Sequence, residues 1–172
     1  MTNRNAAARA PESTHYVNVD LDLYSRVPLD GLVRALGDDA FVLYVGGKRR
    51  KYEAQVELAS SHLDMSADDT IVGLTRLIRR LGRVHRRTWN SAQRREFNLG
   101  IEAGLEPHGF ELRLQERTLE AITDVRGVLV ITSWNGYGSM RRAIGSRMMR
   151  WSSATRSVNR SGASGPPGSP RC

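Results

Sequence analysis

The chain has 172 residues, of which 40% are hydrophobic, and its formal net charge is +8. This length is enough to bury one core and predicts a single folded domain. The only cysteine, Cys172, excludes an internal disulfide, and no apolar run is long enough to span a membrane. The N-terminal sequence MTNRNAAARAPEST lacks the apolar segment of a signal peptide, so we expect a cytoplasmic protein.

The positive charge lies mainly towards the ends of the sequence. Residues 136–172 contain seven arginines and no acidic residue, whereas residues 15–134 contain 17 basic and 17 acidic residues. Residues 1–14 lack periodicity, and residues 136–172 are rich in residues that favour disorder, although Met140, Ile144, Met148 and Trp151 have the spacing of an amphipathic helix that could form on an anionic surface. We therefore predict a disordered lead at 1–14, one neutral folded domain at 15–135 and a disordered basic tail at 136–172.

The first part of the folded domain predicts three strands and a short helix. Residues 17–23 alternate between apolar and polar side chains, which is typical of a strand with one buried face. Residues 28–36 predict a helix that begins at a proline and stops before a glycine. Residues 41–45, FVLYV, are apolar on both faces and predict a central strand. After a Gly-Gly turn, residues 52–58 alternate again and predict a third strand.

A strongly amphipathic helix is predicted next, before a loop at 89–93. Ser66 and Asp69 have the spacing of a capping box, so the helix should begin there. At 100° per residue, one side of this helix is apolar and the other is basic. The apolar side contains Ile71, Leu74, Leu77, Ile78, Leu81 and Val84, and the basic side contains Arg76, Arg79, Arg80, Arg83, Arg86 and Arg87.

The remaining elements complete the predicted sheet. Residues 97–103 and 110–114 alternate and predict two strands, and residues 117–125 predict a helix. Residues 128–134, VLVITSW, predict a last strand that is apolar on both faces. The resulting order, βαββαββαβ, predicts an α+β fold of two layers, in which one mostly antiparallel sheet carries its helices on one face.

Acidic side chains should gather on the sheet face that the helices leave open. An apolar centre with a charged border is typical of a protein interface, and the two apolar strands would form that centre. The alternative is a face that is only solvated. The acidic residues expected there are Asp20, Asp22, Glu53, Glu57, Glu96, Glu102 and Glu111.

These acids predict a binding surface for a protein partner, which would be a cationic protein or a second copy of the chain. Charge reversal at Glu53, Glu57 and Glu96 should then abolish binding. A cation site at Asp20 and Asp22 is a weaker alternative, because two acids two residues apart are too few ligands.

Arginine clusters support an alternative function in nucleic-acid binding. The six arginines of the amphipathic helix could contact phosphates, although no aromatic residue stands between them to stack on bases. The tail at 136–172 could bind nucleic acid or an anionic membrane surface through its own arginines.

No catalytic motif is present in the sequence, so an enzyme is disfavoured. The four histidines are scattered and no pair has the spacing of metal ligands; they are His15, His62, His85 and His108. No serine or cysteine has the context of a nucleophile. We expect no catalytic residue, no cofactor and no bound metal.

The strand pair REFNLGIEAG and FELRLQERTLEAI resembles small bacterial domains of unknown function, some of which are suspected immunity proteins of toxin systems. The resemblance covers residues 16–134. It implies an α+β domain of two layers and transfers no functional residue, and the basic tail departs from it.

Overall fold

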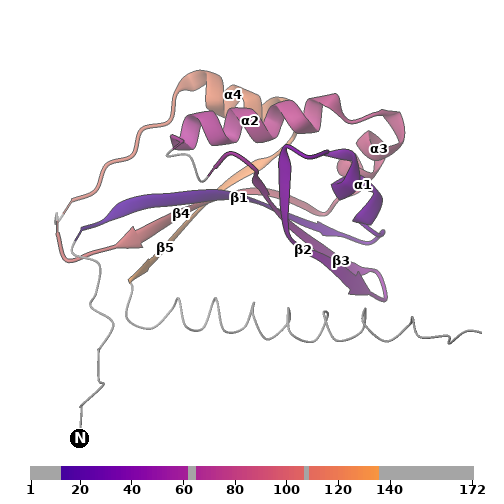
Figure 1. Ribbon diagram of the computed structural model, residues 1–172, viewed down its shortest axis with the longest axis horizontal. Coiled ribbons are helices and arrows are strands. Elements are labelled where there is room, and N and C mark those ends of the chain that lie inside the picture. Colours follow the sequence, from indigo (N-terminus) through magenta and orange to yellow (C-terminus); the bar gives the residue numbers. More distant parts are fainter. Residues whose placement is uncertain (1–12, 62–64, 107–108, 136–172) are drawn as a thin grey trace, which may run out of the picture. The chain divides into compact units, whose positions relative to one another are not determined.

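The described residues form an α+β fold of two layers, in which four helices lie on one face of a five-stranded sheet (Figure 1). The computed structural model describes residues 13–61, 65–106 and 109–135. The fold class predicted from the sequence is confirmed. The predicted tail at 136–172 and nearly all of the predicted lead at 1–14 lie outside the described residues.

The sheet has the strand order β2-β3-β1-β4-β5, and all neighbours are antiparallel except β4 and β5. The parallel pair needs a crossover connection, which contains α4. The elements in chain order are β1 (His15–Ser25), α1 (Asp30–Ala35), β2 (Ala40–Lys48), β3 (Lys51–Leu58), α2 (Ala67–Arg80), α3 (Arg83–Ser91), β4 (Arg94–Ala103), α4 (Glu116–Asp124) and β5 (Val128–Asn135).

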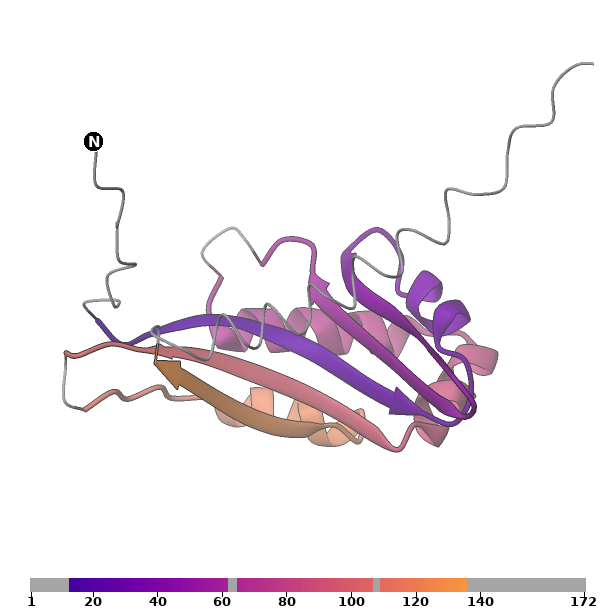
Figure 2. The ribbon, with the colours of Figure 1, turned by 90° about the horizontal axis from the view of Figure 1, so that it is seen from below.

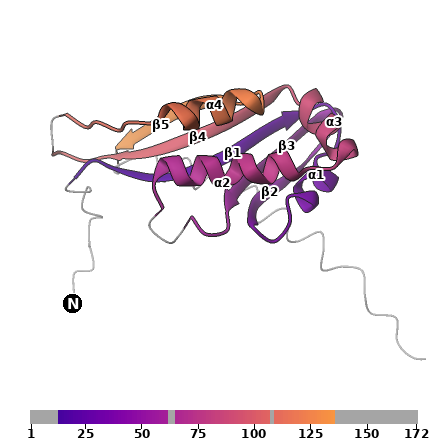
Figure 3. The same ribbon diagram turned by 90° about the horizontal axis from the view of Figure 1, so that it is seen from above.

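The core lies between the helices and the three middle strands. Val19, Leu21 and Leu23 of β1 point from the sheet towards the apolar stripe of α2, where Ile71 and Leu74 are buried. Figure 3 shows α2 and α4 side by side over the sheet, with α1 and α3 at one end. Further fully buried side chains are Leu29, Leu32, Val56, Ile78, Trp89, Phe97 and Leu99.

The amphipathic helix starts where the capping box predicts, because Ser66 Oγ accepts a hydrogen bond from the Asp69 backbone N–H at 3.1 Å. Its predicted continuation past residue 80 is wrong. Leu81 and Gly82 adopt extended backbone angles, and the chain re-enters a helix as α3. Helical periodicity cannot detect this break, because an isolated glycine is tolerated within a helical pattern. As a result, Val84, expected on the apolar side, is 69% exposed.

Trp89, expected in a loop, belongs to α3 and is fully buried. Its indole N–H donates to the Val125 backbone oxygen at 2.8 Å. This bond joins α3 to the end of α4, and it satisfies a polar atom that burial would otherwise penalise. Trp89 is the only buried residue of α3.

The two apolar strands expected at the centre of the sheet, β2 and β5, are its edges. Phe41 of β2 is 58% exposed and Val128 of β5 is 56% exposed. A strand that is apolar on both faces is usually central, but the pattern does not report which strands pair. The pairing of β1 with both β3 and β4 excludes β2 and β5 from the centre.

Residues 110–114 form no strand, which corrects the prediction. β4 already pairs with β1 on one side and with β5 on the other, so no edge of β4 is available to them. Leu112 and Leu114 still pack against the core as the segment approaches α4. Glu111 therefore does not join the acids of the sheet; it is exposed and ion-paired with Arg113.

Replacing Trp89 with phenylalanine should lower the free energy of unfolding by about 1–3 kcal/mol, because the Val125 oxygen loses its buried donor. Val84→Ala is the matched control on the same helix and should change stability by less than about 0.5 kcal/mol, since Val84 is exposed. Urea unfolding followed by far-UV circular dichroism measures both. Equal losses would contradict a structural role for the indole.

Candidate functional site: the open sheet face

The sheet face opposite the four helices, which we call the open face, is covered by no helix among the described residues (Figure 2). Side chains alternate along a strand, so residues that flank the buried ones must point to this face. On β1, Asp20 and Asp22 alternate with Val19, Leu21 and Leu23, which are buried in the core.

Strand register brings six of the predicted acids onto three neighbouring strands. Asp22 lies opposite Gln55 of β3 and opposite Glu96 of β4. Asp20 lies opposite Asn98, and Glu102 near the end of β4 lies opposite His15. The acids on the open face are thus Asp20 and Asp22 from β1, Glu53 and Glu57 from β3, and Glu96 and Glu102 from β4.

Apolar side chains flank this acidic centre, which is the reverse of the predicted arrangement. Phe41 of β2 lies opposite Glu57, and Tyr44 lies opposite Gln55. At the other edge, Val128, Val130 and Trp134 of β5 lie opposite Glu96, Asn98 and Glu102. The prediction was wrong because β2 and β5 border the sheet, so their apolar residues form two margins and leave the carboxylates in the middle.

Asp20 is the most buried acid of the open face, with 7% of its surface exposed. Gln55 Nε2 donates to its Oδ2 at 2.6 Å, and Asn18 Nδ2 donates to its Oδ1 at 2.8 Å. The same Asn18 nitrogen donates to Glu57 Oε1 at 2.8 Å. Burial, followed by the neighbouring Glu57 and Asp22, raises the pKa of Asp20 to about 8, while the bond from Gln55 opposes the shift.

A second, separate group of hydrogen bonds runs from β1 through β4 to β5. Asn98 Nδ2 donates to Asp22 Oδ2 at 3.2 Å, and the Thr132 hydroxyl donates to Asn98 Oδ1 at 2.7 Å. One group of hydrogen bonds thus joins β1 to β3, and the other joins β1 to β4 and β5. Such a network holds the carboxylates at defined positions.

One arginine sits at the end of the acidic centre. The Arg94 guanidinium lies 5.3 Å from the centre of the Tyr24 ring, and Arg94 Nε is 3.9 Å from Glu96 Oε1. Burial raises the pKa of Tyr24, helped by Asp22, Glu53 and Glu96 and opposed by Arg94. Tyr24 and Arg94 were not among the predicted site residues, although their places in the alternating strands β1 and β4 could have put them on this face.

A glycine lets the ring of Trp134 approach β4 closely. A Cβ added at Gly100 would stand 2.7 Å from the Trp134 ring and 2.8 Å from Asn18 Oδ1, so a side chain has no room there. A glycine within a strand often marks such a close approach. The Trp134 indole nitrogen is buried and has no hydrogen-bond partner in the described part of the chain. Trp134 was predicted to lie in a strand and had no predicted role in a site.

No metal site is assembled on this face. Among the described residues, no group of three or more His, Cys, Asp or Glu side chains could hold a metal ion. Asp20 and Asp22, the candidate cation ligands, instead accept hydrogen bonds from side-chain amides. Two acids whose oxygens are used in this way leave a cation few ligands.

The six predicted anion-binding arginines lie on two helices and no longer form one stripe. Arg76, Arg79 and Arg80 belong to α2, while Arg83, Arg86 and Arg87 belong to α3. Arg79 Nη2 lies 2.9 Å from Asp124 Oδ2, and Arg80 Nη2 lies 3.5 Å from Asp39 Oδ2. These ion pairs neutralise part of the charge that a phosphate backbone would need.

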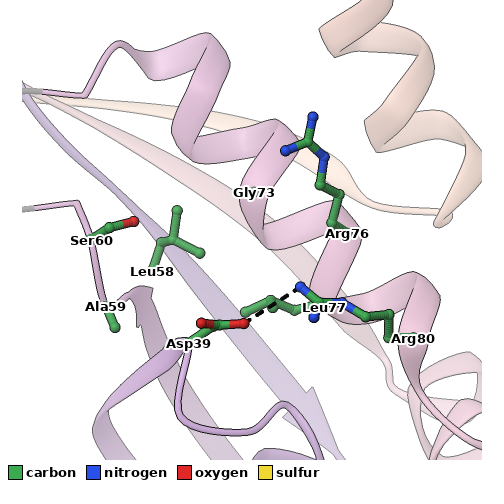
Figure 4. A pocket seen from close by; sticks show the side chains of 8 residues that line it. All are labelled: Asp39, Leu58, Ala59, Ser60, Gly73, Arg76, Leu77 and Arg80. Atoms are coloured by element: carbon green, nitrogen blue, oxygen red, sulfur yellow. Dashed lines mark ion pairs between the residues drawn. The ribbon is translucent and has the colours of Figure 1, made fainter.

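A hollow of about 390 Å³ lies beside α2 (Figure 4). Arg80 points towards Asp39, whereas Arg76 points away from that pair. The two arginines do not converge on one point, so the hollow lacks the geometry of an anion site. Its lining residues are Asp39, Leu58, Ala59, Ser60, Gly73, Arg76, Leu77 and Arg80.

Comparisons with protein-family models, curated proteins and solved structures found no match for this chain. The resemblance of its strand pair to small bacterial domains therefore stays a prediction. In the described ranges, every helix is too short or too polar to cross a lipid bilayer.

Truncating Asn18 to alanine should lower the free energy of unfolding by about 1–3 kcal/mol, because Asp20 and Glu57 lose their common donor. Asn98→Ala is the matched control on the same face. Its effect should be smaller, since its bond to Asp22 is 3.2 Å long and Asp22 is only half-buried. Chemical unfolding at pH 7 compares the two variants. A larger loss for Asn98→Ala would show that the shared amide does not hold the acidic centre.

Proposed function

We propose that this chain is a cytoplasmic, non-enzymatic protein-binding domain whose open face binds a cationic protein. The observation that carries the proposal is an acidic centre that no helix of the described chain covers and that is bordered by exposed apolar strands. The mode of action would be occlusion of the partner, and the resemblance of the strand pair to suspected immunity proteins supports it.

The charge of the open face supports a cationic partner. The strands place six acids and four basic residues on this face; the basic residues are His15, Lys48, Lys51 and Arg94. The helix layer has the opposite balance, because its four helices contain eight arginines and six acidic residues. A concentrated negative potential would steer a positively charged protein to this face and reject an acidic one.

The apolar margins support affinity as well as steering. Phe41 and Val128 are each more than half exposed, and they lie on opposite edge strands. Strands about 4.8 Å apart place β2 about 19 Å from β5, so one partner could contact both margins at once. Burial of aromatic and aliphatic side chains beside satisfied polar groups is what a stable interface requires.

The same charge pattern argues against a symmetric dimer through the open face. A second copy related by a two-fold axis would place the acidic centre against itself, and like charges in an interface are unfavourable.

The second candidate function is nucleic-acid binding through the arginines of α2 and α3. The ion pairs of Arg79 and Arg80 weigh against it.

Reversing two charges on the open face should abolish binding of the basic partner. The variant Glu53→Lys/Glu96→Lys is compared with Glu116→Lys/Glu120→Lys, which makes the same change in net charge on exposed positions of α4. Each full-length bait is incubated with lysate of the native host, and the captured proteins are quantified by mass spectrometry. We expect a basic protein that is captured by the wild type and by the α4 variant, and whose capture falls at least tenfold with the open-face variant.

Raising the salt concentration should weaken the same capture, because the steering charges are screened. Capture that is equal for both double variants would refute the proposal. Loss of capture with the α4 variant alone would place the interface on the helix layer.

A further inference from the structure

Two carboxyl groups at the centre of the open face share a single donor. Asn18 Nδ2 lies 2.8 Å from Asp20 Oδ1 and 2.8 Å from Glu57 Oε1, so the two oxygens are at most about 5.6 Å apart. Asp20 is almost fully buried, which removes the water that would screen two negative charges. Carboxylates at this distance in a poorly solvated place do not both ionise readily.

The groups that face this pair do not neutralise it. Asp22 on β1, Glu53 on β3 and Glu96 on β4 are all acidic neighbours on the same face. Tyr16 of β1 is close enough to interact with both carboxyl groups, and burial raises its pKa, so it stays neutral. From the outer strands, Phe41 of β2 lies opposite Glu57, and Val130 of β5 lies opposite Asn98. Of the cations on this face, Arg94 contacts Tyr24 and Glu96, and Lys48 and Lys51 lie at the β2–β3 turn, six residues along β3 from Glu57.

The raised pKa of Asp20 agrees with the close approach of the two carboxyl groups. Burial is the largest cause that raises the pKa of Asp20, followed by its hydrogen bond with Glu57 and the charges of Glu57 and Asp22. The resulting pKa of about 8 leaves Asp20 protonated at neutral pH. A protonated Asp20 can donate to Glu57 while Asn18 and Gln55 hold both side chains in place.

We propose that Asp20 and Glu57 hold one proton between them at neutral pH and that its loss acts as an alkaline switch on the open face. Losing the proton adds a negative charge to the acidic centre. It also sets two carboxylates against each other across the β1–β3 pair, which weakens the middle of the sheet. The switch belongs to the fold itself and does not rest on the proposed function.

Proton linkage gives the direction in which the switch changes the stability of the fold with pH. The folded protein keeps the Asp20 proton up to a pH of about 8, whereas an aspartate in the unfolded chain releases it near its ordinary pKa of 3.8. Between these values the folded state binds more protons than the unfolded state, so stability falls as the pH rises. The stabilisation is fully present below the unfolded pKa and is lost once the pH passes the folded one.

The coupling of this switch to a partner does rest on the proposed function. A cationic side chain placed on the acidic centre would favour the ionised pair and expel the proton. Capture of a basic partner should therefore strengthen as the pH rises from 7 to 9. The titration below is measured on the protein alone, so its failure and a failure of the proposed function are distinguishable.

The direct test is an NMR titration of the side-chain carboxyl carbons of the full-length protein between pH 4 and pH 10. We expect the Asp20 carbon to titrate near pH 8. Glu57→Gln should lower that midpoint by about one pH unit, because the neighbouring charge is gone and burial remains. Asp22→Asn is the control on the same strand and face. It should shift the midpoint less, because the charge of Asp22 is a smaller cause than Glu57.

Unfolding experiments across the same pH range give an independent readout. Asp20→Asn mimics the protonated side chain, so its unfolding midpoint should depend less on pH than that of the wild type and should exceed it at pH 9. If Asp20→Asn does not fold, the NMR titrations of the wild type and of Glu57→Gln still test whether the proton is shared. A wild-type Asp20 that titrates near pH 4, or a midpoint that Glu57→Gln leaves unchanged, overturns the shared proton.

Discussion

The domain depends on β1, the central strand, which pairs with β3 and β4 and turns its apolar side chains to the helices. Val19, Leu21 and Leu23 must face α2 to complete the core, so Asp20 and Asp22 are forced to the opposite face. A shift of one residue in the register would send the carboxylates into the core, which is prohibitively unfavourable. The position of the acidic centre is therefore a direct consequence of packing.

Acidic side chains that are close together on one sheet repel each other and need hydrogen-bond donors. Side-chain amides of β1, β3 and β4 are these donors. Asn18 and Gln55 hold Asp20, while Asn98 holds Asp22 and is itself held by Thr132. These donors are neutral, so they order the carboxylates without cancelling their charge. The outcome is a hydrogen-bonded acidic centre with apolar margins, and the proposed binding of a basic protein rests on it. The same crowding is what would keep one proton within the pair.

Alternation along the strands was sufficient to place six acids on one face, because the side-chain period of two is local. It did not show which strands are neighbours. Phe41 and Val128 were expected at the centre for that reason and lie at the margins. Arg94 stands beside Tyr24 only through the pairing of β1 with β4, so alternation could place both residues on this face but could not show that they meet.

From the sequence alone one could derive the α+β class, the strands with one wet face and the start of α2, since period and capping chemistry act over a few residues. The break at Gly82, the burial of Trp89, the edge positions of β2 and β5 and the contact between Asp20 and Glu57 were decided by tertiary structure. Each of these depends on groups far apart in the chain competing for the same core or the same strand edge. The periodicity of a short segment cannot predict the outcome of that competition.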